Sequence, residues 1–239
     1  MQALILAGGK GTRLRPYTTV LPKPLMPIGD IPILEIVLRQ LKSAGVDSVI
    51  LAVGYMHQLF QSFFEDGSRY KLSIDYSFED KPLGTAGPIA LAMDRLQEDF
   101  LIMNGDLLTT LNYAALFQYH KDTDSAATIA LHRRTVNIDY GVIDYDKDDQ
   151  LEGYREKPSF NFDVSMGINV LNKASVEKII KPNTYLDIPD LMMQLKQQGD
   201  LVKCYREECD WLDIGRVDDY QLATELFESN RSKFLPDPS

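Results

Sequence analysis

The sequence predicts an α/β fold: a single domain with a mostly parallel central sheet wound by helices, and a β-rich insertion in its second half. Short apolar runs that resemble buried strands alternate with helical repeats over residues 1–125. Helical periodicity then disappears over residues 126–170, where short strands take over. With 239 residues, 44% of them hydrophobic, the chain can bury one substantial core.

The first half contains the elements of a parallel sheet. A helix over 33–44 is predicted by its apolar spacing, with Asp30 as N-cap, Pro32 in the first turn and Gly45 as the stop. A second helix over 56–64 turns Leu59, Phe60 and Phe63 toward the core. The strands are expected at residues 3–7, 46–54, 72–78 and 100–103.

The second half contains the insertion and then returns to helices. Its strands are expected at residues 127–131, 141–145, 151–156 and 165–170, followed by helices over 173–179, 188–197 and 217–228 and a strand over 201–205. Residues 230–239, with two prolines in the last four, look like a frayed tail. We therefore expect one domain over 1–229, made of a first half (1–125), a β-rich half (126–215) and a closing helix (216–229).

The opening of the chain carries the strongest functional signal. The first strand runs into Ala7-Gly8-Gly9-Lys10-Gly11-Thr12-Arg13-Leu14-Arg15-Pro16, and Leu21-Pro22-Lys23-Pro24 follows. Glycines after a strand can turn backbone N–H groups toward a bulky anion. Residues 1–29 hold four basic residues and no acidic one, in a chain of net charge −10. This pattern indicates a site for a small polyphosphate at the carboxyl ends of the strands.

Two common phosphate motifs do not fit this loop. A P-loop requires a lysine directly after its last glycine, whereas Lys10 lies between glycines. A dinucleotide fingerprint requires a third glycine at the position of Leu14. The remaining alternative from spacing alone is a glycine-rich turn with solvated basic residues.

Composition excludes several other classes. An isoelectric point near 4.8 argues against nucleic acid and anionic membranes as partners. The sequence contains neither an apolar run of membrane-spanning length nor a signal-peptide pattern, so we expect a soluble, cytoplasmic protein. Cys204 and Cys209 are predicted to be free thiols, and His57, His120 and His132 to be surface or packing residues.

The opening segment resembles the signature of the sugar-1-phosphate nucleotidylyltransferases, also called nucleotide-sugar pyrophosphorylases. In that family, Gly-Gly-x-Gly-Thr-Arg-Leu and a later Pro-Lys-Pro together enclose a nucleoside triphosphate. Five separated motifs follow the family order over about residues 1–225. The resemblance implies the Rossmann-like nucleotide-diphospho-sugar transferase fold, with a nucleotide-binding half over 1–125 and a sugar-phosphate-binding half over 126–215. It assigns the nucleotide to Leu6, Ala7, Gly8, Gly9, Lys10, Gly11 and Thr12.

The resemblance also implies Mg²⁺ as cofactor and names its ligands. Asp106 in Asn104-Gly105-Asp106 and Asp213 in Trp211-Leu212-Asp213 match the two metal carboxylates of the family, and Asp106 also contacts the nucleotide. Each aspartate could instead cap the helix that follows it. Arg13 matches the residue that grips the leaving pyrophosphate, and Lys23 the residue at the α-phosphate.

The sugar phosphate is assigned to residues of the insertion and its surroundings. In the family's Glu-Lys-Pro motif, here Glu156-Lys157-Pro158, the lysine neutralises the sugar phosphate and the glutamate accepts from sugar hydroxyls. Gly141 and Asn169 match further contact positions, and Asn104 and Tyr185 are looser candidates.

Base recognition is expected in residues 79–88, which resemble the base loop of the family. Glu79 can only accept hydrogen bonds, which suits the adjacent N1–H and 2-amino donors of guanine. Gly84, Thr85 and Gly87 belong to the same loop, where the glycines would let a flat base approach the backbone. Glu79 could also be an exposed loop charge.

The favoured function is therefore transfer of a nucleotidyl group from GTP to mannose 1-phosphate or a related manno-sugar. The alternatives are a UTP- or dTTP-dependent enzyme, a regulatory subunit that senses nucleotide sugars without turnover, and a dinucleotide-dependent oxidoreductase, which lacks its fingerprint. Larger relatives carry a carboxyl-terminal left-handed β-helix for assembly or regulation, which this sequence does not show. We therefore expect any oligomer, such as a homodimer, to form through the catalytic domain.

Overall fold

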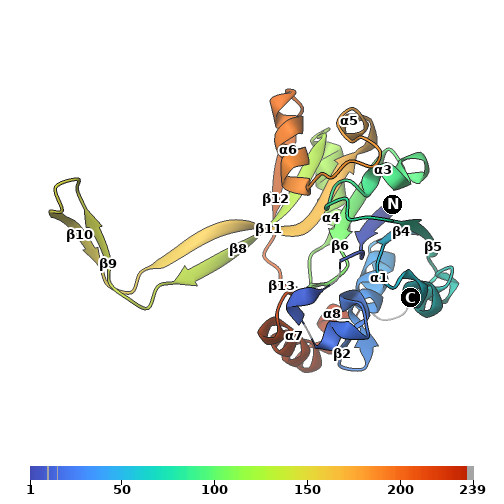
Figure 1. Cartoon of the computed structure of the whole chain (residues 1–239), viewed down its shortest axis with the longest axis horizontal. Helices are drawn as coiled ribbons and strands as arrows, with labels where there is room; N and C mark the ends of the chain where they lie inside the picture. Colours follow the sequence, from blue (N-terminus) through green and yellow to red (C-terminus); the bar gives the residue numbers. More distant parts are fainter. Residues whose placement is uncertain (10, 15, 236–239) are drawn as a thin grey trace.

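The computed structural model describes residues 1–9, 11–14 and 16–235 (Figure 1). Its centre is a seven-stranded mixed sheet in the order β12-β8-β11-β6-β1-β4-β5. All neighbouring strands are parallel except β11, which runs antiparallel to β6 and β8. The strands are β1 (Gln2–Leu6), β4 (Ser48–Val53), β5 (Ser73–Phe78), β6 (Asp99–Asn104), β8 (Ala127–Asn137), β11 (Ser159–Asn172) and β12 (Val202–Arg206). The predicted α/β fold is confirmed.

Helices cover both faces of this sheet. Successive side chains of β1 point to opposite faces, and because they are apolar on both, each face has to be covered. Ala3 and Ile5 of β1 pack into one core, with α1, α2 and α4. Leu4 points to the other core, with α3 and α6. The helices are α1 (Ile33–Ser43), α2 (His57–Phe64), α3 (Ile89–Ala92), α4 (Tyr113–Asp122), α5 (Lys173–Glu177), α6 (Ile188–Gln197), α7 (Val217–Ser229) and α8 (Arg231–Phe234).

Short elements complete the chain between these layers. Five single turns of 3-10 helix are η1 (Thr12–Leu14), η2 (Tyr17–Thr19), η3 (Lys23–Leu25), η4 (Ser68–Tyr70) and η5 (Met93–Arg95). Two small sheets pair β2 (Pro27–Ile28) with β3 (Ile31–Pro32) and β7 (Leu107–Thr109) with β13 (Trp211–Asp213).

The start of α1 differs from the prediction. Its N-cap position is Pro32, without a side-chain cap. Asp30 lies in the turn between β2 and β3 and pairs with Arg231 at 2.6 Å, so it is not the N-cap. Gly45 ends the helix as expected, because its φ of +87° suits glycine.

The prediction for the apolar face of α2 was wrong for one residue, Phe63. Phe60 is buried, but Phe63 is 41% exposed and Phe64 is only 2% exposed. Phe64 packs near Tyr70, which follows the helix, and this tertiary contact decides which phenylalanine faces inward.

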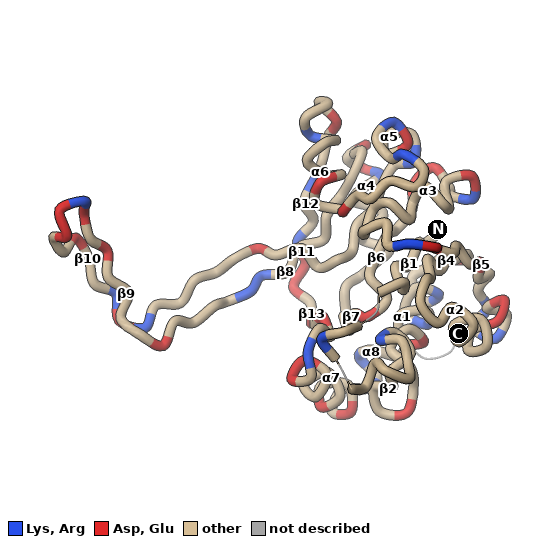
Figure 2. The backbone as a smooth tube through the Cα atoms, viewed as in Figure 1, with Lys and Arg blue, Asp and Glu red and all other residues tan. Residues whose placement is uncertain are grey.

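The insertion forms a projecting hairpin. Strands β8 and β11 are longer than predicted, because they continue past the sheet as a two-stranded ribbon that carries β9 (Val142–Tyr145) and β10 (Leu151–Arg155) at its end. We call residues 133–163 the arm. Figures 1 and 2 show it extending far from the rest of the molecule.

The carboxyl-terminal segment is more ordered than expected. Residues 231–234 form α8, and Phe234 is fully buried beside Phe227 of α7. Gln40 of α1 donates its amide Nε2–H to the Phe234 carbonyl at 2.9 Å. The prediction of a frayed tail was therefore wrong for residues 231–234. Residues 236–239 lie outside the described part of the chain.

Two expectations from composition can be compared with the described residues. Cys204 and Cys209 are both free, as predicted. Nowhere in 1–9, 11–14 and 16–235 does a helix have the length and apolar character needed to cross a membrane.

Candidate active site

A cavity of about 900 Å³ opens at the carboxyl ends of β1, β4 and β6, where the opening loop begins. This is the edge at which ligands of parallel α/β sheets collect. Four segments that are distant in sequence meet here: the glycine-rich loop, the base loop, the end of β6, and residues 185–187. Among the lining residues are Leu6, Ala7, Gly8, Gly9, Gly11, Thr12, Arg13, Lys23, Tyr55, Glu79, Gly84, Thr85, Asn104, Asp106, Tyr185 and Asp187.

The glycine-rich loop is shaped by close contacts. Gly11 has a φ of +58°, and a Cβ there would lie 2.9 Å from Thr18 Cγ2. The Thr18 hydroxyl donates to the Gly11 carbonyl at 2.7 Å, which fixes this turn. A Cβ at Gly8 would lie 2.8 Å from Glu79 Oε1, so this glycine leaves room for the acid. The predicted ligands Lys10 and Arg15 lie outside the described residues.

Lys23 and the two predicted metal carboxylates form one cluster. Lys23 begins η3, and its Nζ lies 2.5 Å from Asp106 Oδ2 and 3.5 Å from Asp213 Oδ1. The lysine side chain is 9% exposed, whereas that of Asp213 is 45% exposed. A cation is thus held between two acids, one inside and one at the surface.

Backbone pairing brings the two acids together. Asp213 in β13 is paired with Leu107 of β7, directly after Asp106. The Ile214 N–H also donates to the Asp106 carbonyl at 3.3 Å. Neither aspartate is a helix cap: Asn112 caps α4, and the N-cap position of α7 is Arg216. This excludes the capping alternative for both residues.

Asp106 is the most constrained group of the cluster. Burial raises the pKa of its carboxyl, and the neighbouring Lys23 opposes that shift. Its second oxygen, Oδ1, is buried without a hydrogen-bond partner in the described part of the chain. An unpaired buried carboxylate oxygen is costly, and coordination of a cation would satisfy it.

Arg13 lies beside this cluster on η1 and lines the cavity with an exposed side chain. A Cβ at Gly215 would lie 3.7 Å from Arg13 Nη1, so the guanidinium runs next to the Asp213-Ile214-Gly215 segment. Arg13, Lys23 and Asp106 therefore line the large cavity together, with Asp213 next to them.

Glu79 lines the cavity directly after β5, next to Gly8 of the glycine-rich loop. Burial raises the pKa of its carboxyl, and a hydrogen bond from the Leu83 N–H to Oε2, 3.1 Å long, opposes the shift. It is half-buried in the cavity wall rather than a solvated loop charge.

The glycines of the predicted base loop, residues 79–88, pack closely against another segment of the chain. A Cβ at Gly84 would lie 2.5 Å from the Leu186 carbonyl oxygen, and one at Gly87 would lie 2.7 Å from that of Thr184. The absence of a side chain at both positions leaves room for the 184–187 segment. The binding role of Gly84 stays a prediction.

Asp187 is a structural member of this wall that the sequence analysis missed. Its Oδ1 accepts from the Thr85 N–H at 2.9 Å and from the Thr85 hydroxyl at 3.1 Å. Tyr185 donates to its other oxygen at 2.8 Å. Although burial raises the pKa of Asp187, these hydrogen bonds hold it below its ordinary value. No motif marks this acid, because its partner Thr85 lies far away in the sequence.

A smaller cavity of about 250 Å³ adjoins the first and shares Leu6, Thr85 and Asn104 with it. Asn169 and Asp213 also line it. Asn169 is buried, and its Oδ1 has no hydrogen-bond partner among the described residues. This oxygen is available to a ligand that donates hydrogen bonds.

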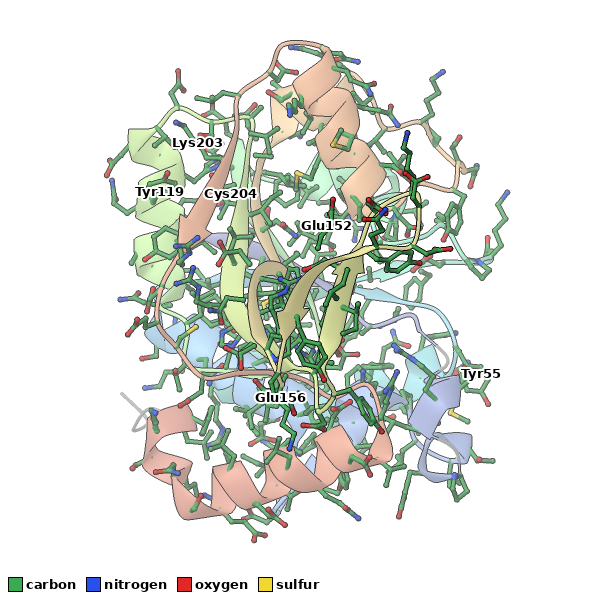
Figure 3. The ribbon with its side chains drawn as sticks, turned by 90° about the vertical axis from the view of Figure 1, so that its left-hand side faces the viewer. Tyr55, Tyr119, Glu152, Glu156, Lys203 and Cys204 are labelled. Carbon is green, nitrogen blue, oxygen red and sulfur yellow. The ribbon has the colours of Figure 1, made fainter. Side chains whose placement is uncertain are left out.

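The other predicted sugar-phosphate residues are not brought to either cavity. Gly141, Glu156 and Lys157 all lie on the arm, and none of them lines the cavities described above. Lys157 has a φ of +45°, a strained conformation for a residue with a side chain. In Figure 3, which looks along the arm toward the sheet, Glu156 lies on the arm. Tyr55, which lines the large cavity, lies on the body of the molecule at the right of the view.

An α/β sheet with a glycine-rich anion loop, a buried lysine and paired carboxylates defines a nucleotide-binding domain built for phosphate chemistry. Comparison with known proteins gives the family. The chain belongs to the family described as "Nucleotidyl transferase", whose model matches residues 2–230. Sugar-phosphate nucleotidyltransferase activity follows from this membership and from the relatives below.

Named relatives and solved structures agree with this family. The chain is 34% identical to a probable mannose-1-phosphate guanylyltransferase 1 of Oryza sativa subsp. japonica and 33% identical to a mannose-1-phosphate guanyltransferase of Schizosaccharomyces pombe. Each match covers 99% of this chain and 67% of the relative. Among solved structures, HddC from Yersinia pseudotuberculosis in complex with GMP-PN has a TM-score of 0.72 and 27% identity, over 95% of this chain and 99% of that one.

Proposed function

We propose that this chain transfers a nucleoside monophosphate from a nucleoside triphosphate to a sugar 1-phosphate, giving a nucleoside diphosphate sugar and pyrophosphate. GTP is the favoured triphosphate, and mannose 1-phosphate or a close manno-configured sugar is the favoured acceptor. The contact of Lys23 with Asp106 and Asp213, at the cavity lined by the glycine-rich loop and at its smaller neighbour, carries this proposal. Such a cluster suits reactions in which charge at phosphate must be neutralised.

The chemical step is a direct displacement at the α-phosphorus. An oxygen of the sugar 1-phosphate forms the new bond, and the bond to the β-phosphate bridging oxygen breaks in line, releasing pyrophosphate. Lys23 neutralises the α-phosphate, and the planar fork of Arg13 binds the departing pyrophosphate. The attacking phosphate is already ionised at neutral pH, so these residues position groups and stabilise charge without acting as a general base.

Asp106 and Asp213 are the residues that would hold Mg²⁺. The unpaired, buried Oδ1 of Asp106 supports this assignment, as does the half-exposed carboxylate of Asp213 beside it. Mg²⁺ is commonly held by one or two carboxylates, with substrate phosphates supplying further oxygens. In the described residues no group of three or more His, Cys, Asp or Glu could bind a metal by itself, which agrees with a site completed by substrate. When bound, Mg²⁺ supplies charge neutralisation and orientation of the triphosphate.

Guanine is favoured by Glu79 and by the relatives. The half-buried carboxylate can accept from both donors on the guanine edge. The two named relatives are guanylyltransferases of mannose 1-phosphate, and one similar structure holds GMP-PN. For the acceptor, Asn104 and Asn169 line the smaller cavity, where sugar hydroxyls could pair with the Asn169 oxygen.

A substrate panel tests the proposal. GTP, UTP, dTTP and ATP are each combined with mannose, glucose and N-acetylglucosamine 1-phosphates, and pyrophosphate is measured with and without Mg²⁺. We expect release that requires Mg²⁺ and both substrates and is fastest with GTP and a manno-sugar. Fastest release with UTP or dTTP would establish the alternative specificity. Nucleotide-sugar binding without turnover would indicate a sensing subunit.

A further inference from the structure

The arm carries three of the predicted sugar-phosphate residues, yet it stands away from the site of its own chain. No hydrogen bond or ion pair joins residues 134–162 to the rest of the described chain. Gly141, Glu156 and Lys157 lie on the arm, which extends away from the body in Figure 1, and none of the three lines either cavity.

The base of the arm is fixed in this extended direction. Pairing of β8 with β11 runs without interruption from Leu131↔Ser165 to Asn137↔Ser159. On one side, Arg206 of β12 forms an ion pair with Asp163. On the other side, the Trp211 indole N–H donates to the Met166 carbonyl at 3.0 Å. The ladder shifts register between Ser165 and Asn169, where the arm joins the sheet, and these two contacts flank that shift on both sides.

The surface of the arm is unusually apolar for an isolated ribbon. Of the sixteen exposed large hydrophobic side chains of the described chain, seven lie on the arm. A two-stranded ribbon is at best marginally stable alone in water, and a cluster of exposed apolar residues indicates a contact surface. The seven residues are Val136, Tyr140, Ile143, Tyr145, Leu151, Tyr154 and Phe162.

We propose that the arm docks on a second copy of this chain and completes the sugar end of that copy's active site. This inference rests on the proposed function. β8 is parallel to β1 and β6, because both β8 and β6 run antiparallel to β11, so the arm leaves the sheet at the edge where the cavities open. Two copies related by a twofold axis can therefore exchange arms, each reaching the site edge of the other.

Charge favours a second copy as the occupant. Residues 144–152, at the end of the arm, contain five acidic residues and one lysine, while residues 1–29 contain four basic residues and no acid. Figure 2 shows the acidic residues at the end of the arm. In a chain of net charge −10, the opening segment has in its sequence the charge opposite to that of the arm's end.

In the exchanged dimer, each site combines residues of two chains. Asp106, Lys23 and Asn169 come from one copy. Lys157 and Glu156 come from the arm of the other, where the lysine neutralises the sugar phosphate and the glutamate accepts from sugar hydroxyls. The strained backbone at Lys157 fits a side chain held ready for a ligand.

Mixing two inactive variants tests this arrangement. Asp106→Asn disables the body of the site, and Lys157→Ala disables the arm. After coexpression with two affinity tags, a heterodimer with exchanged arms contains one site that is intact in both parts. In the heterodimer purified through both tags one of the two sites is intact, so we expect about half of the wild-type rate, far above either variant alone. A mixture no more active than its components would overturn the proposal, even if the protein is dimeric.

Mass measurement gives a readout that does not depend on activity. We expect wild type to sediment as a dimer, and Leu151→Asp on the arm to shift it toward monomer. Leu201→Asp, the same substitution at an exposed leucine outside the arm, should leave the dimer intact. A monomeric, active wild type would contradict the arm proposal. A dimer without turnover on any sugar phosphate would contradict the proposed function while leaving arm docking supported.

Discussion

The Lys23 ammonium contacts the Asp106 carboxylate at 2.5 Å, although both groups are largely withdrawn from water. The attraction between the two charges offsets the free energy lost when each is removed from water. Loss of one partner leaves the other charge buried and unpaired. Asp213, at 3.5 Å from the same ammonium, extends the cluster to the surface. Because desolvation of the charges offsets most of their attraction, a buried cluster of this kind adds little to the stability of the fold. Its position beside the glycine-rich loop therefore argues for a role in function.

Asp106→Asn and Asp213→Asn are predicted to reduce turnover by about 100-fold or more, because each removes a carboxylate assigned to the metal. The fold should remain intact, since asparagine keeps the shape and the other aspartate still faces Lys23. Steady-state rates and circular dichroism check both points. Near-normal turnover in both variants would contradict the assignment.

Glu79→Gln is predicted to reduce the preference for GTP over UTP by about tenfold, because an amide cannot accept from both guanine donors. Ratios of kcat/KM for the two triphosphates measure this effect. An unchanged ratio would show that the base is recognised elsewhere.

The raised pKa of Glu79 also predicts a pH dependence. In the folded protein, the carboxylate takes up a proton at a higher pH than an ordinary glutamate. GTP affinity should therefore weaken as pH falls through that raised pKa, and Glu79→Gln should lack this step. The effect on stability has the opposite sign. Because the folded protein binds this proton more tightly than the unfolded chain, the free energy of unfolding falls as pH rises through the raised pKa. Glu79→Gln should therefore match or exceed the Tm of wild type near neutral pH.

Asn169→Leu is predicted to raise KM for the sugar phosphate by about tenfold without lowering Tm, because the buried oxygen that it removes has no partner in the described chain. Asn172→Leu on the same strand is the matched control. The Asn172 amide bonds Asp99 and Ser175, so its loss should lower the stability by about 1–3 kcal/mol. Equal destabilisation by both substitutions would exclude a ligand role for Asn169.

His120 is predicted to make the fold sensitive to mild acid. Burial lowers the pKa of its imidazole, with Asp99 at 3.4 Å opposing. The unfolded chain then binds the proton more readily, so stability is complete above the ordinary histidine pKa of about 6.5 and falls as pH drops below it. Tm measured from pH 7.5 to pH 5 should fall less steeply in His120→Gln. Parallel curves would contradict this role.

Sequence reasoning predicted most of what local chemistry determines. The strands of the sheet follow from their apolar runs, and α6 (Ile188–Gln197) has the predicted bounds. Lys23, Asp106 and Asp213 could be named from motifs, but their contact depends on the pairing of β7 with β13, two three-residue strands without a recognisable pattern.

The errors arose where contacts between distant parts of the chain determine the position of a residue. Asp30 has the residue type of an N-cap but pairs with Arg231. Asp187 supports the base loop through Thr85, a contact that no local pattern reveals. The length of the arm depends on the pairing of β8 with β11 beyond the sheet, where alternation is weak because both faces meet water.

The most direct test of the central claim is pyrophosphate release by the wild-type protein from GTP and mannose 1-phosphate. We predict release that requires both the sugar phosphate and Mg²⁺, with one GDP-sugar formed per pyrophosphate. Absence of release with every pair of triphosphate and sugar phosphate, from a protein shown to be folded, would contradict it.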